Sequence, residues 1–136
     1  NKRKERPHAL TKLGLSFTKL VAYLGHEKDI RIPDGVESIG EDAFSYTPIR
    51  NVVLPSTVVE IKKRAFSHTC LKYIDLCNVE CIGQEAFCIC KLETLTIPKS
   101  VKEIQAEAFA YSGLVLEQIE NYSNVKIDDH ILITYR

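Results

Sequence analysis

The chain lacks an excess of charge of either sign and has no long apolar run. Its eighteen Lys and Arg residues balance eighteen Asp and Glu residues. A balanced chain creates no long-range field that would attract nucleic acid, so we expect no nucleic-acid partner. No apolar run approaches the roughly 20 residues that a membrane-spanning helix needs, and we therefore expect no membrane insertion.

Motifs that carry chemistry are also missing. The sequence has no H-E-x-x-H pair, its four histidines stand outside known nucleophile motifs, and its six glycines form no run that could cradle a phosphate. The first residues are charged and show no signal-peptide pattern. We predict no catalytic residue, no cofactor and no enzymatic activity.

Cysteine is present in an odd number, so at least one thiol is free or pairs between molecules. The odd count favours a reducing setting and keeps a cytoplasmic location open. The spacings between the last four cysteines, x3, x6 and x1, differ from the C-x2-4-C pairs of common zinc sites, so we predict no metal site. A disulfide between Cys70 and Cys90 is one alternative to free thiols. The five residues are Cys70, Cys77, Cys81, Cys88 and Cys90.

The sequence does contain 45% apolar residues, and many of them recur at a fixed interval. The pair Ala-Phe occurs four times, with phenylalanine spacings of 22, 21 and 22 residues. An isoleucine precedes each alanine by four residues, and a valine precedes each isoleucine by three. A proline precedes three of these valines, whereas the third copy is one residue shorter and has Cys77 instead. The phenylalanines are Phe44, Phe66, Phe87 and Phe109.

This period lies in the range of leucine-rich repeats, in which each copy forms one coil of a solenoid. The predicted fold is a β-rich α/β solenoid of about four 21–22-residue coils. The apolar alternation before each proline predicts strands at 30–32, 51–54, 73–76 and 94–97, which we expect to form one parallel sheet on one face. Short helical turns are predicted elsewhere, for example at 62–66.

The same register makes two predictions about stacking. Phe66 and Phe87 should be buried in consecutive coils and in contact. In the position before each alanine, Arg64 should lie between Asp42 and Glu85, where opposite charges attract.

The repeat resembles the BspA-like leucine-rich repeat family. The segment 30–44, Ile-Arg-Ile-Pro-Asp-Gly-Val-Glu-Ser-Ile-Gly-Glu-Asp-Ala-Phe, follows that family's pattern of an apolar strand ending in Pro, then Val-x-x-Ile-Gly-x-x-Ala-Phe. Tyr23-Leu24-Gly25 resembles the lead-in that opens such arrays, and 128–135 resembles the same lead-in again. The departures are Cys77 for Pro, and Lys62 and Gln105 where Gly is usual. The resemblance implies a surface or secreted protein that binds a partner protein.

We expect residues 1–16 to form a flexible basic tail and residues 17–136 to form the solenoid, with a lead-in at each end. Residues 9–24 are expected to cap the first coil as a short helix or a hairpin. The candidate ligand-binding surface is the set of outward residues on the predicted strands, here called the strand face. It binds a protein or glycan in the favoured interpretation; in the alternative, the chain is a structural spacer or intracellular scaffold. Its residues are Asp29, Arg31, Asn51, Val53, Tyr73, Asp75, Thr94 and Thr96.

Overall fold

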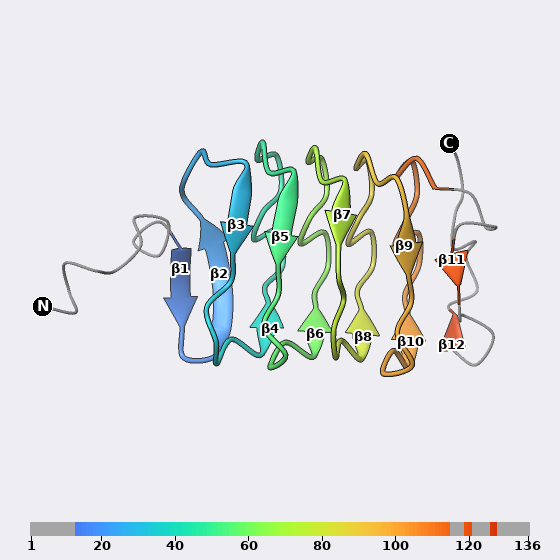
Figure 1. The fold of residues 1–136 in the computed structure, drawn as a ribbon, viewed down its shortest axis with the longest axis horizontal. Coiled ribbons are helices and arrows are strands. Elements are labelled where there is room, and N and C mark those ends of the chain that lie inside the picture. Colours follow the sequence, from blue (N-terminus) through green and yellow to red (C-terminus); the bar gives the residue numbers. More distant parts are fainter. Residues whose placement is uncertain (1–12, 115–118, 121–125, 128–136) are drawn as a thin grey trace, which may run out of the picture.

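In a computed structural model of the chain, stacked coils form an elongated solenoid (Figure 1). The structure describes residues 13–114, 119–120 and 126–127. The strands are β1 (Leu13–Ser16), β2 (Lys19–Tyr23), β3 (Asp29–Arg31), β4 (Ser38–Ile39), β5 (Asn51–Val53), β6 (Glu60–Ile61), β7 (Tyr73–Ile74), β8 (Cys81–Ile82), β9 (Leu95–Thr96), β10 (Glu103–Ile104), β11 (Ile119–Glu120) and β12 (Lys126–Ile127).

Each coil contributes one strand to each of two ladders. The half of each repeat that contains the regularly spaced valine and isoleucine contributes to a seven-stranded sheet in the order β1-β2-β4-β6-β8-β10-β12. The other half, which ends at the repeat proline and is here called the leucine half, forms a sheet in the order β3-β5-β7. Every pairing between coils is parallel, because each coil returns to the same point in the same direction.

The prediction that the four leucine-half strands form one parallel sheet is wrong for the last of them, β9. β5 pairs with β3 and with β7, but β9 belongs to a separate two-stranded sheet with β11. The interruption lies beside the shortened third copy, in which one residue is missing from the connection that follows β7. Parallel direction is retained throughout, so the solenoid itself is as predicted.

The predicted helical turns are also wrong, since the described part of the chain contains no helix. In the first copy, Asp42 and Tyr46 have φ of 58° and 61°, and the equivalent residues of the other three copies are also left-handed. A right-handed helix cannot pass through such residues. The segment instead forms consecutive turns, in which Ala43 N–H donates to Gly40 O and Ser45 N–H donates to Asp42 O.

The N-terminal end is a hairpin. β1 and β2 pair antiparallel with a bulge at Gly14/Leu15, and β2 then pairs parallel with β4. This decides between the two predicted caps in favour of the hairpin. Residues 13–16, assigned to the tail from the sequence, are instead its first strand, because Leu13 is buried and pairs with Tyr23. The rest of the tail and the second lead-in, at 128–135, lie outside the described residues.

The core is a column of aromatic rings enclosed by aliphatic residues. All four repeat phenylalanines are fully buried. Their centroids are 5.1, 5.4 and 5.3 Å apart along the stack, and Tyr23 covers the first ring at 5.4 Å. The predicted burial and contact of Phe66 and Phe87 are confirmed.

Truncating a ring inside this column should be costly. Phe66→Ala is expected to lower the free energy of unfolding by about 3–5 kcal/mol, because it removes contacts with two neighbouring rings and leaves a cavity. Urea denaturation followed by circular dichroism measures the change. The matched control is Phe17→Ala, since Phe17 is fully exposed at the hairpin turn and its removal should change stability by less than about 0.5 kcal/mol. Equal effects of the two substitutions would contradict the ring column.

The predicted charge column is present on the outer surface. Arg64 Nε lies 3.0 Å from Asp42 Oδ1, and its Nη1 lies 3.8 Å from Glu85 Oε1. The hydrogen bond from Arg64 is the main cause that lowers the pKa of Asp42. The fourth member, Glu107, follows Glu85 with the same sign of charge.

Reversing the central charge should weaken the stack in a salt-dependent manner. Arg64→Glu is expected to lower the melting temperature by about 2–4 °C at low salt and by less at high salt, because ions screen exposed charges. Arg64→Gln, which removes the charge without adding an acid, should lie between the wild type and Arg64→Glu. Melting curves at two salt concentrations test this, and a penalty that is independent of salt would rule out the electrostatic account.

Candidate functional site

The strand face is formed by the leucine-half strands. Along β3, β5 and the segments around β7 and β9, buried side chains alternate with exposed ones, as the period of two requires. Ile30, Val52, Ile74 and Leu95 point into the core. All eight predicted strand-face residues are exposed.

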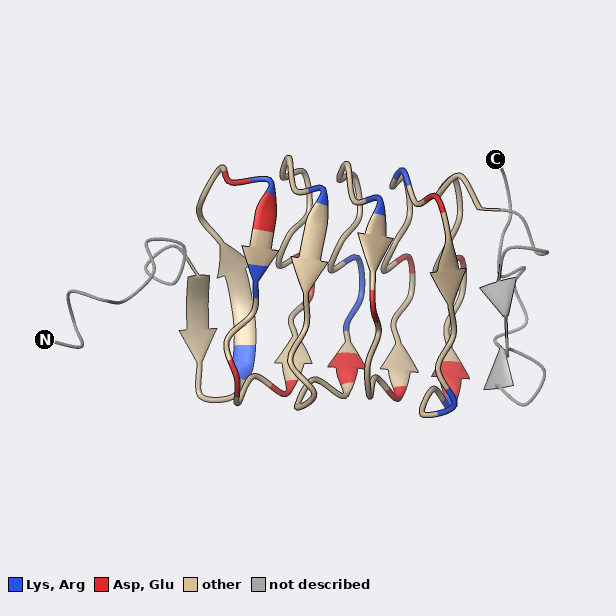
Figure 2. Cartoon of the chain, viewed as in Figure 1, with Lys and Arg blue, Asp and Glu red and all other residues tan. Residues whose placement is uncertain are grey.

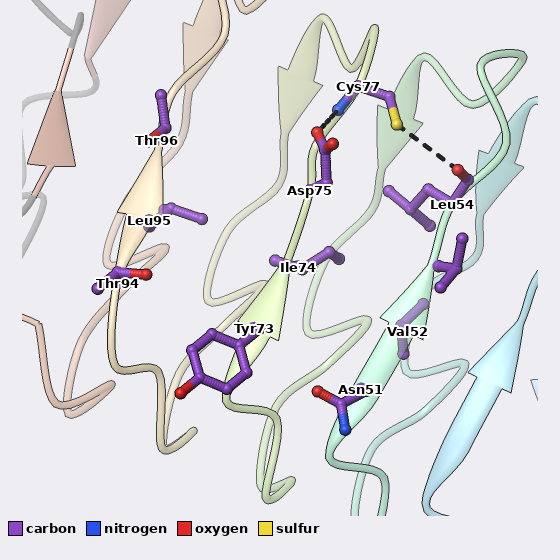
Figure 3. A pocket seen from close by; sticks show the side chains of 11 residues that line it. Asn51, Val52, Leu54, Tyr73, Ile74, Asp75, Cys77, Thr94, Leu95 and Thr96 are labelled. Carbon is purple, nitrogen blue, oxygen red and sulfur yellow. Dashed lines mark hydrogen bonds between the residues drawn. The ribbon is translucent and has the colours of Figure 1, made fainter.

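Six of the eight predicted residues line a groove of about 720 Å³ (Figure 3). The groove extends from β5 across β7 to β9, over the place where the sheet is interrupted. Asp29 and Arg31, on β3, are not part of its lining. The complete lining is Asn51, Val52, Val53, Leu54, Tyr73, Ile74, Asp75, Cys77, Thr94, Leu95 and Thr96.

The irregular third copy lies at the centre of this groove. Cys77, at the position of the repeat proline, adopts a left-handed conformation with φ of 49°. Its backbone N–H, which a proline would lack, donates to Asp75 Oδ1 at 2.9 Å, and its Sγ lies 3.5 Å from Leu54 O. This short turn follows β7, which has two residues where β5 has three, and β9 is not paired with it. The groove therefore coincides with the departure from the repeat.

Hydrogen bonds hold the polar side chains of the groove. The Tyr73 hydroxyl donates to Glu93 Oε1, and Lys72 Nζ lies 3.9 Å from Glu93 Oε2. The hydrogen bond to Glu93 is the first cause that raises the pKa of Tyr73, so this hydroxyl is neutral at physiological pH. At the other end, Asn51 Nδ2 donates to Asp29 Oδ1 at 2.7 Å. The side chains of Tyr73 and Asn51 are thus oriented before any ligand arrives.

Sequence reasoning missed the turn at Cys77 and the hydrogen bond that orients Tyr73. From the sequence, Cys77 is only a residue that replaces the repeat proline. The signal was available in the sequence, because the missing residue and the missing proline occur together in the third copy. Glu93 has no such signal, since its contact with Tyr73 depends on how two coils stack.

The cysteines do not form an activated or metal-binding group. Among the residues that the structure describes, no three His, Cys, Asp or Glu side chains are arranged to hold a metal ion. All five thiols are free, so the alternative of a Cys70–Cys90 disulfide is not realised. Burial raises the pKa of Cys90 to about 12 and that of Cys81 to about 11. Since the thiolate is the nucleophile and the metal ligand, these shifts work against both roles.

The other surfaces of the described residues have fewer features of a binding site than the strand face. A smaller hollow of about 320 Å³ lies on the side of the seven-stranded sheet, lined in part by Lys19, Glu60, Lys62 and Lys63. Glu60 there is 3.9 Å from Lys62 Nζ, so its charges are partly matched within the chain. Figure 2 shows both signs of charge interspersed along the coils. The described residues include no helix of the length and apolar character that a membrane span requires.

Parallel coils of 21–22 residues, with two strands in each, define a solenoid of the leucine-rich repeat class. The profile of the BspA type leucine rich repeat region matches residues 23–131 in six copies. The chain therefore belongs to the BspA-type leucine-rich repeat family, as its sequence predicted. Such repeats are generally scaffolds for protein interaction and are typically not enzymes. No curated protein and no solved structure matches the chain significantly.

The state of the thiols can be tested by alkylation without reductant. Iodoacetamide at neutral pH should leave Cys90 unmodified in the folded chain, because the thiol is buried and its pKa is raised. After denaturation, mass spectrometry should find all five cysteines modified. Three modified cysteines would reveal a disulfide, and rapid native modification of Cys90 would contradict its burial.

Proposed function

We propose that the chain is a non-enzymatic binding module that holds a partner protein in the groove on its strand face. The observation that carries this proposal is the groove itself, in which the exposed apolar groups of Val53 and Tyr73 lie among polar side chains. Binding sites combine apolar area with a few oriented polar groups in this way. Solenoids commonly bind along the surface that their stacked repeats create.

The polar groups of the groove favour a protein partner. Tyrosine is enriched at the energetic centres of protein interfaces, because its ring buries a large area at a small entropic cost. Tyr73 is 48% exposed and its hydroxyl is already bound to Glu93, so its side chain would lose little conformational freedom on binding. The threonine hydroxyls of the opposite wall also suit a glycan, which is the second ligand class that the experiment below distinguishes.

Family resemblance supports a location at the cell surface or in a secreted protein. In such a setting the module would present its groove to another molecule outside the cell. In the competing interpretation the coils act as a spacer or an intracellular scaffold, with no dedicated ligand. The two differ in whether substitutions in the groove affect any interaction.

A pair of tyrosine substitutions tests the proposal. Capture of partners from an extract of the source organism by the immobilised chain is followed by their identification, purification and measurement of Kd. Tyr73→Ala should weaken binding about tenfold, as the loss of a central interface tyrosine does. Tyr46→Ala is the matched control, because Tyr46 is 76% exposed but lies outside the groove.

Three outcomes are informative. Loss of affinity in Tyr73→Ala alone supports the groove as the site. If removing glycans from the partner abolishes binding, the ligand is a glycan. Equal affinities of both variants, or binding that depends neither on the groove nor on the partner's glycans, would replace the proposal with the spacer interpretation.

A further inference from the structure

One carboxylate gives the groove its charge. Among the eleven lining residues, Asp75 is the single Asp, Glu, Lys, Arg or His. Cys77 stays a neutral thiol, because burial and the nearby Asp75 raise its pKa. The groove therefore carries a localised negative charge, placed on its β7 wall.

Asp75 has no ion pair among the described residues. Its Oδ1 accepts the Cys77 N–H, which fixes the orientation of the carboxylate, and no described hydrogen bond involves Oδ2. A partner that covered this carboxylate with apolar or neutral groups would remove it from water without compensation, at a considerable cost in free energy. A cation would offset that cost.

The aromatic side chain lies on the same wall. Tyr73 precedes Asp75 by two residues, so both side chains emerge on the same face, about 7 Å apart along the strand. Figure 3 shows both beside the groove. The stem of a lysine or arginine can pack against a tyrosine ring while its charged end reaches a nearby carboxylate. Thr94 and Thr96, in the segment around β9 of the next coil, have hydroxyl oxygens that can accept hydrogen bonds.

An acidic ligand fits less well. The basic residues at this face all lie outside the groove lining; they are Lys28, Arg31, Arg50 and Lys72. Lys72 is already paired with Glu93. A carboxylate that entered the groove would meet Asp75 rather than a cation.

We propose that the groove takes a lysine or arginine side chain of the partner protein, with the Asp75 carboxylate as its counter-ion and the Tyr73 ring as its apolar contact. This proposal rests on the proposed function and adds the chemistry of the partner. The cation on the partner is the feature by which the groove would distinguish ligands, because juxtaposed like charges disfavour wrong partners.

The test uses a random peptide library displayed on phage and selected on the whole chain, under reducing conditions. Counter-selection on Thr96→Trp, which fills the groove without adding charge, removes peptides that bind elsewhere. The remaining peptides should share a lysine or arginine at one position. Synthetic versions then give Kd values for the wild type and its variants.

Asp75→Asn should weaken these peptides at least about fivefold, because it removes the counter-ion. Asparagine keeps an oxygen that can accept the Cys77 N–H, and an unchanged denaturation midpoint would show that the turn is intact. Asp29→Asn, on the same face but outside the groove, should change Kd less than about twofold. Replacing the basic residue of the peptide with norleucine should cost as much as Asp75→Asn, and the two changes together should not add.

Groove-dependent peptides without a shared basic residue, or with equal Kd for the wild type and Asp75→Asn, would overturn the cation proposal and leave the binding groove standing. Acidic peptides that depend on Arg50 would overturn it in favour of the opposite charge. If every peptide that binds the wild type is removed by counter-selection on Thr96→Trp, the groove is not a binding site and the proposed function fails too.

Discussion

The structure depends on backbone hydrogen bonds that alternate between the coil and its neighbour in the Ala-Phe turn. In the first copy, the N–H groups of Asp42, Phe44 and Tyr46 donate to carbonyls of the next coil, with 2.8 Å from Phe44 N to Ala65 O. The N–H groups of the residues between them donate within the coil. A helix would direct all of these donors along its own axis and leave nothing to join the coils. Left-handed residues make the alternation feasible, and the next coil holds them in that conformation.

Because this pattern repeats, each coil is placed in register with the one before, and every position becomes a column. These columns of equivalent positions explain which positions of the repeat accept a different residue. At Gly83 an added Cβ would lie 2.7 Å from Lys62 C, so a side chain there would force the coils apart. Lys62 and Gln105 occupy the same column in the neighbouring coils, where the N–H bond to the preceding coil is 2.9 Å instead of 2.7 Å. The solenoid absorbs the difference locally, without loss of register.

The sequence was sufficient for the architecture because the apolar columns repeat in four copies. The ring column of Phe66 and Phe87, the parallel direction of the coils and the position of Arg64 between two acids all follow from spacing alone. The turn conformation could not be predicted in this way. Asp, Tyr, Arg and His carry no signal for positive φ comparable to that of glycine, and their conformation is imposed by contacts with another coil.

The candidate site could be predicted only in part, for a related reason. Alternation identifies which side chains of β5, β7 and β9 face outward, but it does not show that β7 and β9 fail to pair with each other. That interruption lies next to the shortened turn around Cys77, which is held by contacts with Asp75 Oδ1 and Leu54 O. A perfect repeat presents the same surface in every coil and therefore has no unique place for a ligand. The missing residue removes that equivalence. The coil that departs from the pattern is also the coil at which the strand face has a groove, an exposed ring and a carboxylate without an ion pair among the described residues.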